Sequence, residues 1–133
     1  MRDYNQPCIV VDIDGTLCPT RPQGMEYAAL PILSPVVECL RAHHQQGWYI
    51  ILYTARQERT YEGNIGLRTA HTVPVLLEWL KRNEIPFDEL RIDKPWHGFR
   101  GFTVDDKAVP PKVFTSLSAD EIIHTWLPHY QIK

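Results

Sequence analysis

Short apolar runs alternate with amphipathic segments along this chain, and three of these runs end at a polar side chain. The runs and the residues that follow them are 8–11 with Asp12, 48–53 with Thr54, and 102–104 with Asp105 and Asp106. Continuous apolar runs of this length are typical of parallel strands that are buried on both faces. Residues 90–92 are a fourth, weaker candidate strand.

The intervals between the runs carry helix signals. Ser34 is the predicted N-cap of a first helix, and Gly47 is the residue just beyond its C-terminus. A second helix is predicted over residues 73–82, and a third begins at the capping box Ser118–Glu121. The apolar faces predicted for the three helices are Val36, Val37 and Leu40; Val75, Leu76, Trp79 and Leu80; and Ile122, Ile123 and Trp126.

Strands that alternate with helices predict an α/β protein with a doubly wound, Rossmann-like parallel sheet flanked by helices. The length of 133 residues fits a single domain that spans residues 1–133. In such sheets the site lies beyond the carboxyl ends of the strands. The polar residues at the strand ends are therefore expected to meet in one crevice.

Composition narrows the class of protein. The net charge of −2 gives no basic footprint for nucleic acid, so a nucleic-acid partner is not expected. The three cysteines are odd in number and lack zinc spacing, which favours reduced thiols and a cytoplasmic location. Cys18 is interpreted as a small packing residue. No apolar run approaches the length of a membrane span, so a soluble protein without a membrane partner is expected.

A crevice that gathers Asp12, Asp105 and Asp106 would bring several like charges together. A cation is needed to keep such carboxylates ionised, and hard oxygen ligands favour Mg²⁺. Because Mg²⁺ usually keeps few protein ligands and completes its shell with water and phosphate, the substrate is expected to carry phosphate.

Asp14 stands two residues after Asp12 and is followed by Gly15, where a turn can bring its carboxylate over the same pocket. Two carboxylates in different environments can divide the work, one attacking phosphorus and the other moving protons. Thr54 can donate to a phosphoryl oxygen, and Lys94 can balance charge in the transition state.

These pieces match a known family in type and order. DIDGT at 12–16, Thr54 in YTAR, Lys94 in DKPWH and VDD at 104–106 resemble the four motifs of the haloacid-dehalogenase (HAD) superfamily of phosphatases. The longer string from TARQERTYEGNIG to KPWHGFRGFTVDDKAVPP resembles a subgroup described as capsule or cell-surface polysaccharide biosynthesis phosphatases.

The resemblance implies a role for each matching residue. Asp12 would be the nucleophile and a metal ligand, and Asp14 the general acid/base whose backbone carbonyl also binds Mg²⁺. Thr54 and Lys94 would bind the phosphoryl group. Metal ligands implied by the resemblance are Asp12, Asp14, Asp105 and Asp106, without a decision on which of the last two ligates directly.

Cap domains of this superfamily are inserted after Asp14 or between Thr54 and Lys94, and neither interval is long enough for one. The resemblance therefore implies a capless enzyme with an open site, which suits large substrates or closure by a neighbouring subunit in a homo-oligomer. Loops on the active face are expected to contact the substrate through Arg56, Arg59, Tyr61, Asn64, Trp96 and His97.

The expected function is hydrolysis of a phosphomonoester through an aspartyl-phosphate, on a sugar phosphate or related small metabolite. Two alternatives stay open: a polynucleotide or nucleotide phosphatase, and a non-catalytic protein that binds a phosphorylated ligand. A calcium-binding EF-hand loop is disfavoured, because its sixth and twelfth positions would hold Leu17 and Gln23 instead of glycine and glutamate.

Overall fold

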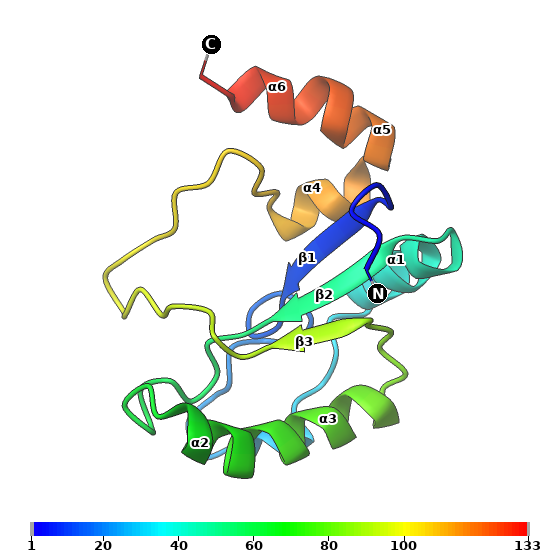
Figure 1. The fold of residues 1–133 in the computed structure, drawn as a ribbon. Coiled ribbons are helices and arrows are strands. Elements are labelled where there is room, and N and C mark those ends of the chain that lie inside the picture. Colours follow the sequence, from blue (N-terminus) through cyan, green and yellow to red (C-terminus); the bar gives the residue numbers. More distant parts are fainter. Residues whose placement is uncertain (1, 133) are drawn as a thin grey trace. The chain divides into compact units, whose positions relative to one another are not determined.

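The computed structural model describes residues 2–132, which form two compact units that divide between Trp96 and His97 (Figure 1). The elements of the first unit are β1 (Cys8–Asp12), the 3-10 turn η1 (Tyr27–Ala29), α1 (Ser34–Gln45), β2 (Tyr49–Tyr53), α2 (Ile65–Leu67), the π-helical segment η2 (Arg68–Thr72), α3 (Val73–Arg82) and β3 (Glu89–Arg91).

The three strands form one parallel sheet in the order β1-β2-β3. Asp12 is in register with Tyr53, and Tyr53 is in register with Arg91, so the three strands finish at one edge. The predicted strands at 8–11, 48–53 and 90–92 are therefore confirmed, with small shifts of their bounds. The protein is an α/β protein whose small parallel sheet is flanked by helices, compatible with a Rossmann-like fold.

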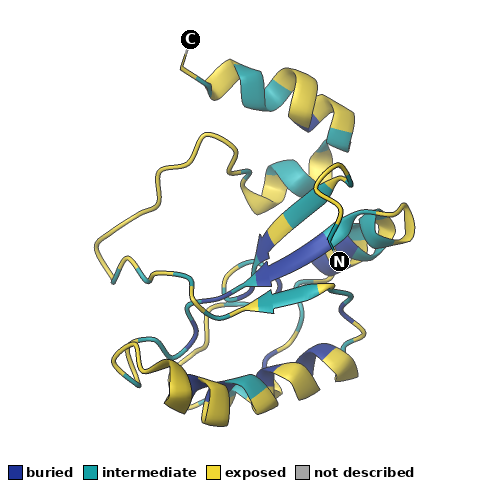
Figure 2. Ribbon diagram, viewed as in Figure 1, coloured by how far each residue is buried: buried dark blue, intermediate teal, exposed yellow. Residues whose placement is uncertain are grey.

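Burial separates the two faces of β1, because Val11 is buried while its neighbour Val10 is 59% exposed. The central strand β2 is almost wholly buried (Figure 2). Helices α1 and α3 supply the apolar partners through Val36, Val37 and Leu40 and through Leu76, Trp79 and Leu80. Helices on the second face of the sheet, which a doubly wound fold requires, stay a prediction.

The predicted apolar face of the first helix is confirmed, because Val36, Val37 and Leu40 are all buried. The faces predicted for the second and third helices are confirmed in part, through Leu76, Trp79 and Leu80 and through Ile122. Val75 and Ile123 are exposed instead, with exposed fractions of 41% and 45%. Helix α1 begins at Ser34 with Leu33 as its N-cap, one residue earlier than predicted. Gly47 lies just beyond the helix with a left-handed φ of 95°, as expected for that position.

The second unit consists of short helical segments between irregular stretches. Its elements are α4 (Pro111–Ser116), α5 (Ala119–Glu121), the π-helical segment η3 (Ile122–Trp126) and α6 (Leu127–Tyr130). The predicted capping box at Ser118 is confirmed: the Ser118 hydroxyl accepts from the Glu121 amide, and the Glu121 carboxylate accepts from the Ser118 amide.

The predicted strand at 102–104 is wrong, since these residues are irregular. A strand needs a partner for its ladder of hydrogen bonds, and residues 97–132 contain only helices and irregular segments. None of the helices in residues 2–132 has the length and apolar content needed to cross a lipid bilayer.

Trp79 ties α3 to the segment that leads into α1, because its indole Nε1 donates to the carbonyl oxygen of Leu30 over 2.7 Å. Both residues are buried. Trp79→Phe should lower the free energy of unfolding by about 1–3 kcal/mol, since a buried carbonyl loses its donor. Urea unfolding monitored by circular dichroism measures this, with Leu77→Ala on the exposed side of α3 as the control that should change it by less than about 0.5 kcal/mol.

Candidate functional site

An ion pair between Asp12 and Lys94 lies at the carboxyl end of β1. Both residues are predicted site residues, but their direct contact is not predicted from the sequence. The Lys94 ammonium donates to Oδ1 of Asp12 over 2.8 Å, and the Thr16 hydroxyl donates to Oδ2 over 3.2 Å. The Asp12 side chain remains 33% exposed and that of Lys94 27%. The pair is therefore preformed and still accessible to a ligand.

A tight turn follows β1 and places Asp14 beside this pair. The carbonyl oxygen of Ile13 accepts from the amides of Thr16 and Leu17, and the Gly15 amide donates to the carbonyl oxygen of Cys18. Gly15 has a φ of 87°, a left-handed conformation that glycine adopts without steric cost. The predicted turn at Gly15 is confirmed.

Arg56 binds the Asp14 carboxylate in a bidentate manner. Its Nε donates to Oδ2 over 3.1 Å, and its Nη2 donates to Oδ1 over 3.0 Å. The Arg56 side chain is 1% exposed and that of Asp14 is 26% exposed. From the sequence, Arg56 is predicted to contact substrate, whereas its guanidinium binds Asp14 and is hidden from solvent.

Tyr27 and Arg68, neither of which is among the predicted site residues, hold Arg56 in place. The Tyr27 ring lies against the guanidinium, with 4.5 Å between Cζ and the ring centroid. The buried Arg68 donates from Nε and Nη2 to the carbonyl oxygen of Arg56 over 3.2 and 3.1 Å. Arg68 thus fixes the backbone of Arg56, and the two carboxylates of the site are each paired with one cation, Asp12 with Lys94 and Asp14 with Arg56.

Thr54 lies just beyond the end of β2 and is buried. Its hydroxyl oxygen accepts from the Arg56 amide over 3.0 Å, and its own amide donates to the carbonyl oxygen of Arg91. A threonine hydroxyl that accepts one bond keeps its proton for donation. The hydroxyl is thus oriented by the backbone of the segment that carries Arg56.

Cys18 is fully buried under this site, as its interpretation as a packing residue requires. Burial raises the pKa of the Cys18 thiol to about 12, and the neighbouring Asp14 carboxylate acts in the same direction. The thiol is therefore protonated at neutral pH, so Cys18 does not supply a thiolate nucleophile.

Of the other predicted substrate-contacting residues of the first unit, Arg59, Tyr61 and Asn64 lie in the segment after β2, and Trp96 lies after β3. The Tyr61 ring stacks on His71 with centroids 5.8 Å apart. Asn64 is the N-cap of α2 and accepts from the Leu67 amide over 3.1 Å. Trp96 is half-buried and Arg59 is exposed. Asn64 thus has a structural role in addition to any ligand contact.

His97, Asp105 and Asp106 belong to the second unit. The exposed His97 donates from Nδ1 to the carbonyl oxygen of Gly98, and the Asp105 carboxylate accepts from the Lys107 amide over 2.9 Å. Within residues 2–132 no three His, Cys, Asp or Glu side chains form a ready metal-binding cluster. The structure thus brings Asp12, Asp14, Lys94 and the Thr54–Arg56 segment together, while Asp105 and Asp106 stay candidates by sequence.

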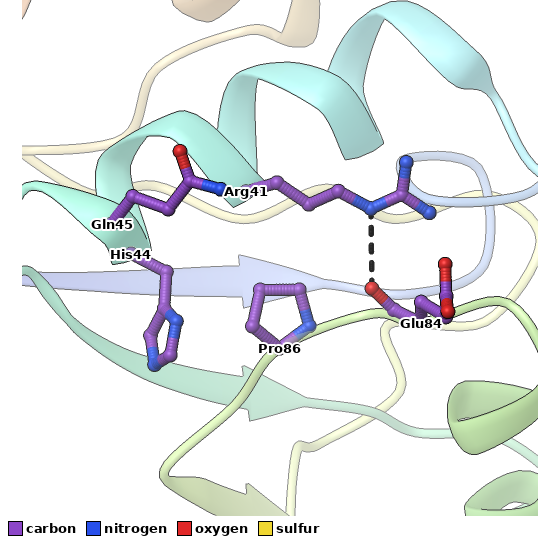
Figure 3. A pocket seen from close by; sticks show the side chains of 5 residues that line it. All are labelled: Arg41, His44, Gln45, Glu84 and Pro86. Carbon is purple, nitrogen blue, oxygen red and sulfur yellow. Dashed lines mark hydrogen bonds between the residues drawn. The ribbon is translucent and has the colours of Figure 1, made fainter.

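A pocket of about 240 Å³ lies elsewhere, at the amino end of the sheet (Figure 3). Arg41 in its wall donates to the backbone carbonyl oxygens of Asn83 and Glu84, and His44 lies 3.9 Å from Asp88. These contacts link the C-terminal half of α1 to the segment before β3. The pocket therefore has a structural explanation and lies at the opposite end of the strands from Asp12.

The Asp14–Arg56 pair is the main feature that sequence reasoning missed, because its members are 42 residues apart. The pair could have been predicted from the pairing of the first two strands and from the charges that follow them. Asp12 and Tyr53 are direct neighbours on adjacent parallel strands, so residues just beyond them can lie close together. Opposite charges at positions 14 and 56 then predict an ion pair.

The fold and this site define an α/β protein with a parallel sheet whose carboxyl edge carries two carboxylates, each bound by a cation. A Vibrio cholerae protein solved as a structural-genomics target superposes on it with a TM-score of 0.88 and 40% identity, covering 95% of this chain and 100% of that one. The chain belongs to the same family as this Vibrio cholerae protein.

Other comparisons add little. Two structures of a Pnkp1/Rnl/Hen1 complex, one described as an RNA repair complex, align at 22% identity with TM-scores of 0.45 and 0.46. The alignments cover 75% and 86% of this chain, and 30% and 36% of those chains. This similarity is too weak to support a conclusion about the present protein. No family model matches the chain, and no curated protein matches it.

Proposed function

We propose that this protein is a Mg²⁺-dependent phosphomonoester hydrolase of the HAD superfamily, with a capless, doubly wound core that works in the cytoplasm. The observation that carries the proposal is the pair of carboxylates at the end of β1. Asp12 is accessible and bound to Lys94, whereas Asp14, two residues further, is fixed by Arg56. Two neighbouring carboxylates with different cationic partners can divide the roles of nucleophile and proton carrier.

In the proposed reaction, an Asp12 carboxylate oxygen attacks phosphorus while the bond from phosphorus to the leaving oxygen breaks. Asp14 donates a proton to that oxygen, so the product leaves as an alcohol. Asp14 then takes a proton from water, which attacks the phosphoryl group and releases Asp12 with inorganic phosphate. The Lys94 ammonium has further N–H groups to donate to the phosphoryl oxygens, and the Thr54 hydroxyl has one proton to donate.

The residues at this site fit a bound Mg²⁺. The Asp12 carboxylate offers hard oxygen donors and is partly open to solvent. Asp14 would contribute its backbone carbonyl oxygen, because its carboxylate is bound to Arg56. We propose Asp105 and Asp106 as the remaining ligands. A bound Mg²⁺ would neutralise phosphate charge and orient the phosphoryl group toward Asp12.

The proposed substrate is a sugar phosphate or related small metabolite, on the strength of the resemblance to capsule polysaccharide phosphatases. Hydrolysis of p-nitrophenyl phosphate should require Mg²⁺, stop on chelation and return on Mg²⁺ addition. Changing Asp105 and Asp106 together to Asn should raise the Mg²⁺ concentration for half-maximal rate roughly tenfold or more.

The same assay separates the alternatives. Preference for 3′-phosphorylated oligonucleotides or nucleotides over sugar phosphates would indicate a polynucleotide or nucleotide phosphatase. Saturable binding of inorganic phosphate without turnover would indicate a non-catalytic phospho-ligand-binding protein, and the proposed hydrolase would be rejected.

A further inference from the structure

The buried arginine behind Asp14 is the feature that the proposed reaction leaves unexplained. In that reaction Asp14 moves protons, and nothing in it requires an arginine that is hidden from substrate. Yet Arg56 binds both Asp14 carboxylate oxygens and is only 4% exposed as a whole residue. Its charge has been taken out of water, which costs free energy that apolar residues of similar size would not.

Stability alone gives a poor account of this arrangement. The Nη1 group of Arg56 is buried and has no hydrogen-bond partner among the described residues, which adds to the cost of its burial. The next residue, Gln57, adopts a left-handed φ of 58°, a conformation that is unfavourable for a residue other than glycine. Its Oε1 accepts from the Thr72 hydroxyl over 2.6 Å, which helps to hold it there.

Several contacts instead fix the guanidinium in one orientation. Tyr27 lies against its face, Nη2 lies 3.8 Å from the Cys18 sulfur, and the Arg56 amide donates to the Thr54 hydroxyl. Arg68 then holds the carbonyl oxygens of Arg56 and Thr54. Locally unfavourable backbone and buried polar groups that their surroundings maintain are typical of functional sites.

We propose that Arg56 is a positioning residue whose planar, bidentate contact fixes the plane of the Asp14 carboxylate for proton transfer. The proposal rests on the proposed phosphatase function. The guanidinium donates to both oxygens, and Oδ1 also accepts from the Cys18 thiol over 3.6 Å, so the remaining lone pair of Oδ2 is held in a defined direction. Arg68 and Tyr27 contribute by holding Arg56, and the 26% of the Asp14 side chain that is exposed is the part available to substrate.

Leaving-group dependence tests this role. p-Nitrophenolate leaves phosphorus readily without a proton, whereas the phenolate from phenyl phosphate depends more on a general acid. Arg56→Lys, which keeps the charge but loses the bidentate geometry, should lower kcat/KM for phenyl phosphate by roughly 10- to 100-fold. It should lower kcat/KM for p-nitrophenyl phosphate by less than about threefold, because little proton transfer is needed.

Arg41 supplies the matched control. It too donates from its guanidinium to groups of the first unit, the backbone carbonyl oxygens of Asn83 and Glu84, but at the other end of the sheet. Figure 3 shows the bond to Glu84. Arg41→Lys should leave kcat/KM for both substrates unchanged. Tyr27→Leu leaves the ion pair in place but removes the ring that lies against the guanidinium. It should therefore lower kcat/KM for phenyl phosphate more than for p-nitrophenyl phosphate, by a smaller factor than Arg56→Lys does. This variant tests the proposal if Arg56→Lys does not fold.

A second readout needs neither Mg²⁺ nor turnover. In metal-free protein, the carboxyl carbon NMR signal of Asp14 should shift in Arg56→Lys and stay in place in Arg41→Lys. Equal losses of kcat/KM for both substrates, or an unshifted Asp14 signal, would overturn the positioning role while the phosphatase stands. Wild-type protein without Mg²⁺-dependent turnover of either substrate would overturn the proposed function, and this inference with it.

Discussion

Asp12→Asn should lower turnover of p-nitrophenyl phosphate by at least roughly 10⁴-fold, because the variant loses the proposed nucleophile. An amide is a poor nucleophile, and the substitution also removes one negative charge from the proposed Mg²⁺ ligands. The fold should remain, since an asparagine in this position can still accept a hydrogen bond from Lys94 or Thr16, as Asp12 does. Circular dichroism and urea unfolding check that the folded state is retained.

The phosphoenzyme gives the direct measurement. Mass spectrometry after acid quenching should find a phosphorylated peptide that contains Asp12 in the wild type and none in Asp12→Asn. Asp93→Asn is the control, because it removes an exposed carboxylate next to Lys94 in the sequence without touching the proposed machinery. Asp12→Asn protein that turns over substrate within tenfold of the wild-type rate would show that another group attacks phosphorus.

The site residues that could be predicted from the sequence are those marked by patterns of neighbouring residues. A continuous apolar run followed by a polar residue identifies a buried parallel strand and its carboxyl end, which is how Asp12 and Thr54 are found. The glycine after Asp14 predicts the turn, and the structure has that turn. These features depend on residues that are close in sequence, so a single chain is enough to detect them.

The features that sequence reasoning missed depend on contacts between distant residues. From the sequence, Arg56 is a cationic residue in a loop. Only the structure shows that its side chain lies beside Asp14. Tyr27 and Arg68 acquire their roles only through Arg56. No local pattern distinguishes a buried arginine from an exposed one, because the difference lies in what surrounds it.

The strand at 102–104 was predicted wrongly because a short local pattern suggested a strand that has no neighbouring strand to pair with in residues 97–132. Phe102 and Val104 have side chains that suit a strand, but strand propensity mainly reflects packing against neighbouring strands. Gly101 precedes this short run and Asp105 follows it, so little in the local sequence extends it. Three residues were too few for their composition to decide the structure.

Asp14→Asn should slow both half-reactions by roughly 10²- to 10⁴-fold where proton transfer is needed, and its kinetics should differ from those of Asp12→Asn. With p-nitrophenyl phosphate, the first half-reaction needs little proton donation, so Asp12 is still phosphorylated. Attack by water needs a general base in the second half-reaction, so the phosphoenzyme should accumulate.

Rapid mixing of Asp14→Asn with p-nitrophenyl phosphate and Mg²⁺ should therefore release a burst of p-nitrophenol stoichiometric with enzyme, followed by slow turnover. The side-chain amide of this variant can still accept one hydrogen bond from Arg56, but its NH₂ group replaces the second acceptor oxygen and faces the buried guanidinium, so the free energy of unfolding should fall by about 1–3 kcal/mol. Asp12→Asn should give no burst under the same conditions. A wild-type steady-state rate in Asp14→Asn would mean that another group transfers the proton. The contact between Asp14 and Arg56 would then have no role in the proposed reaction.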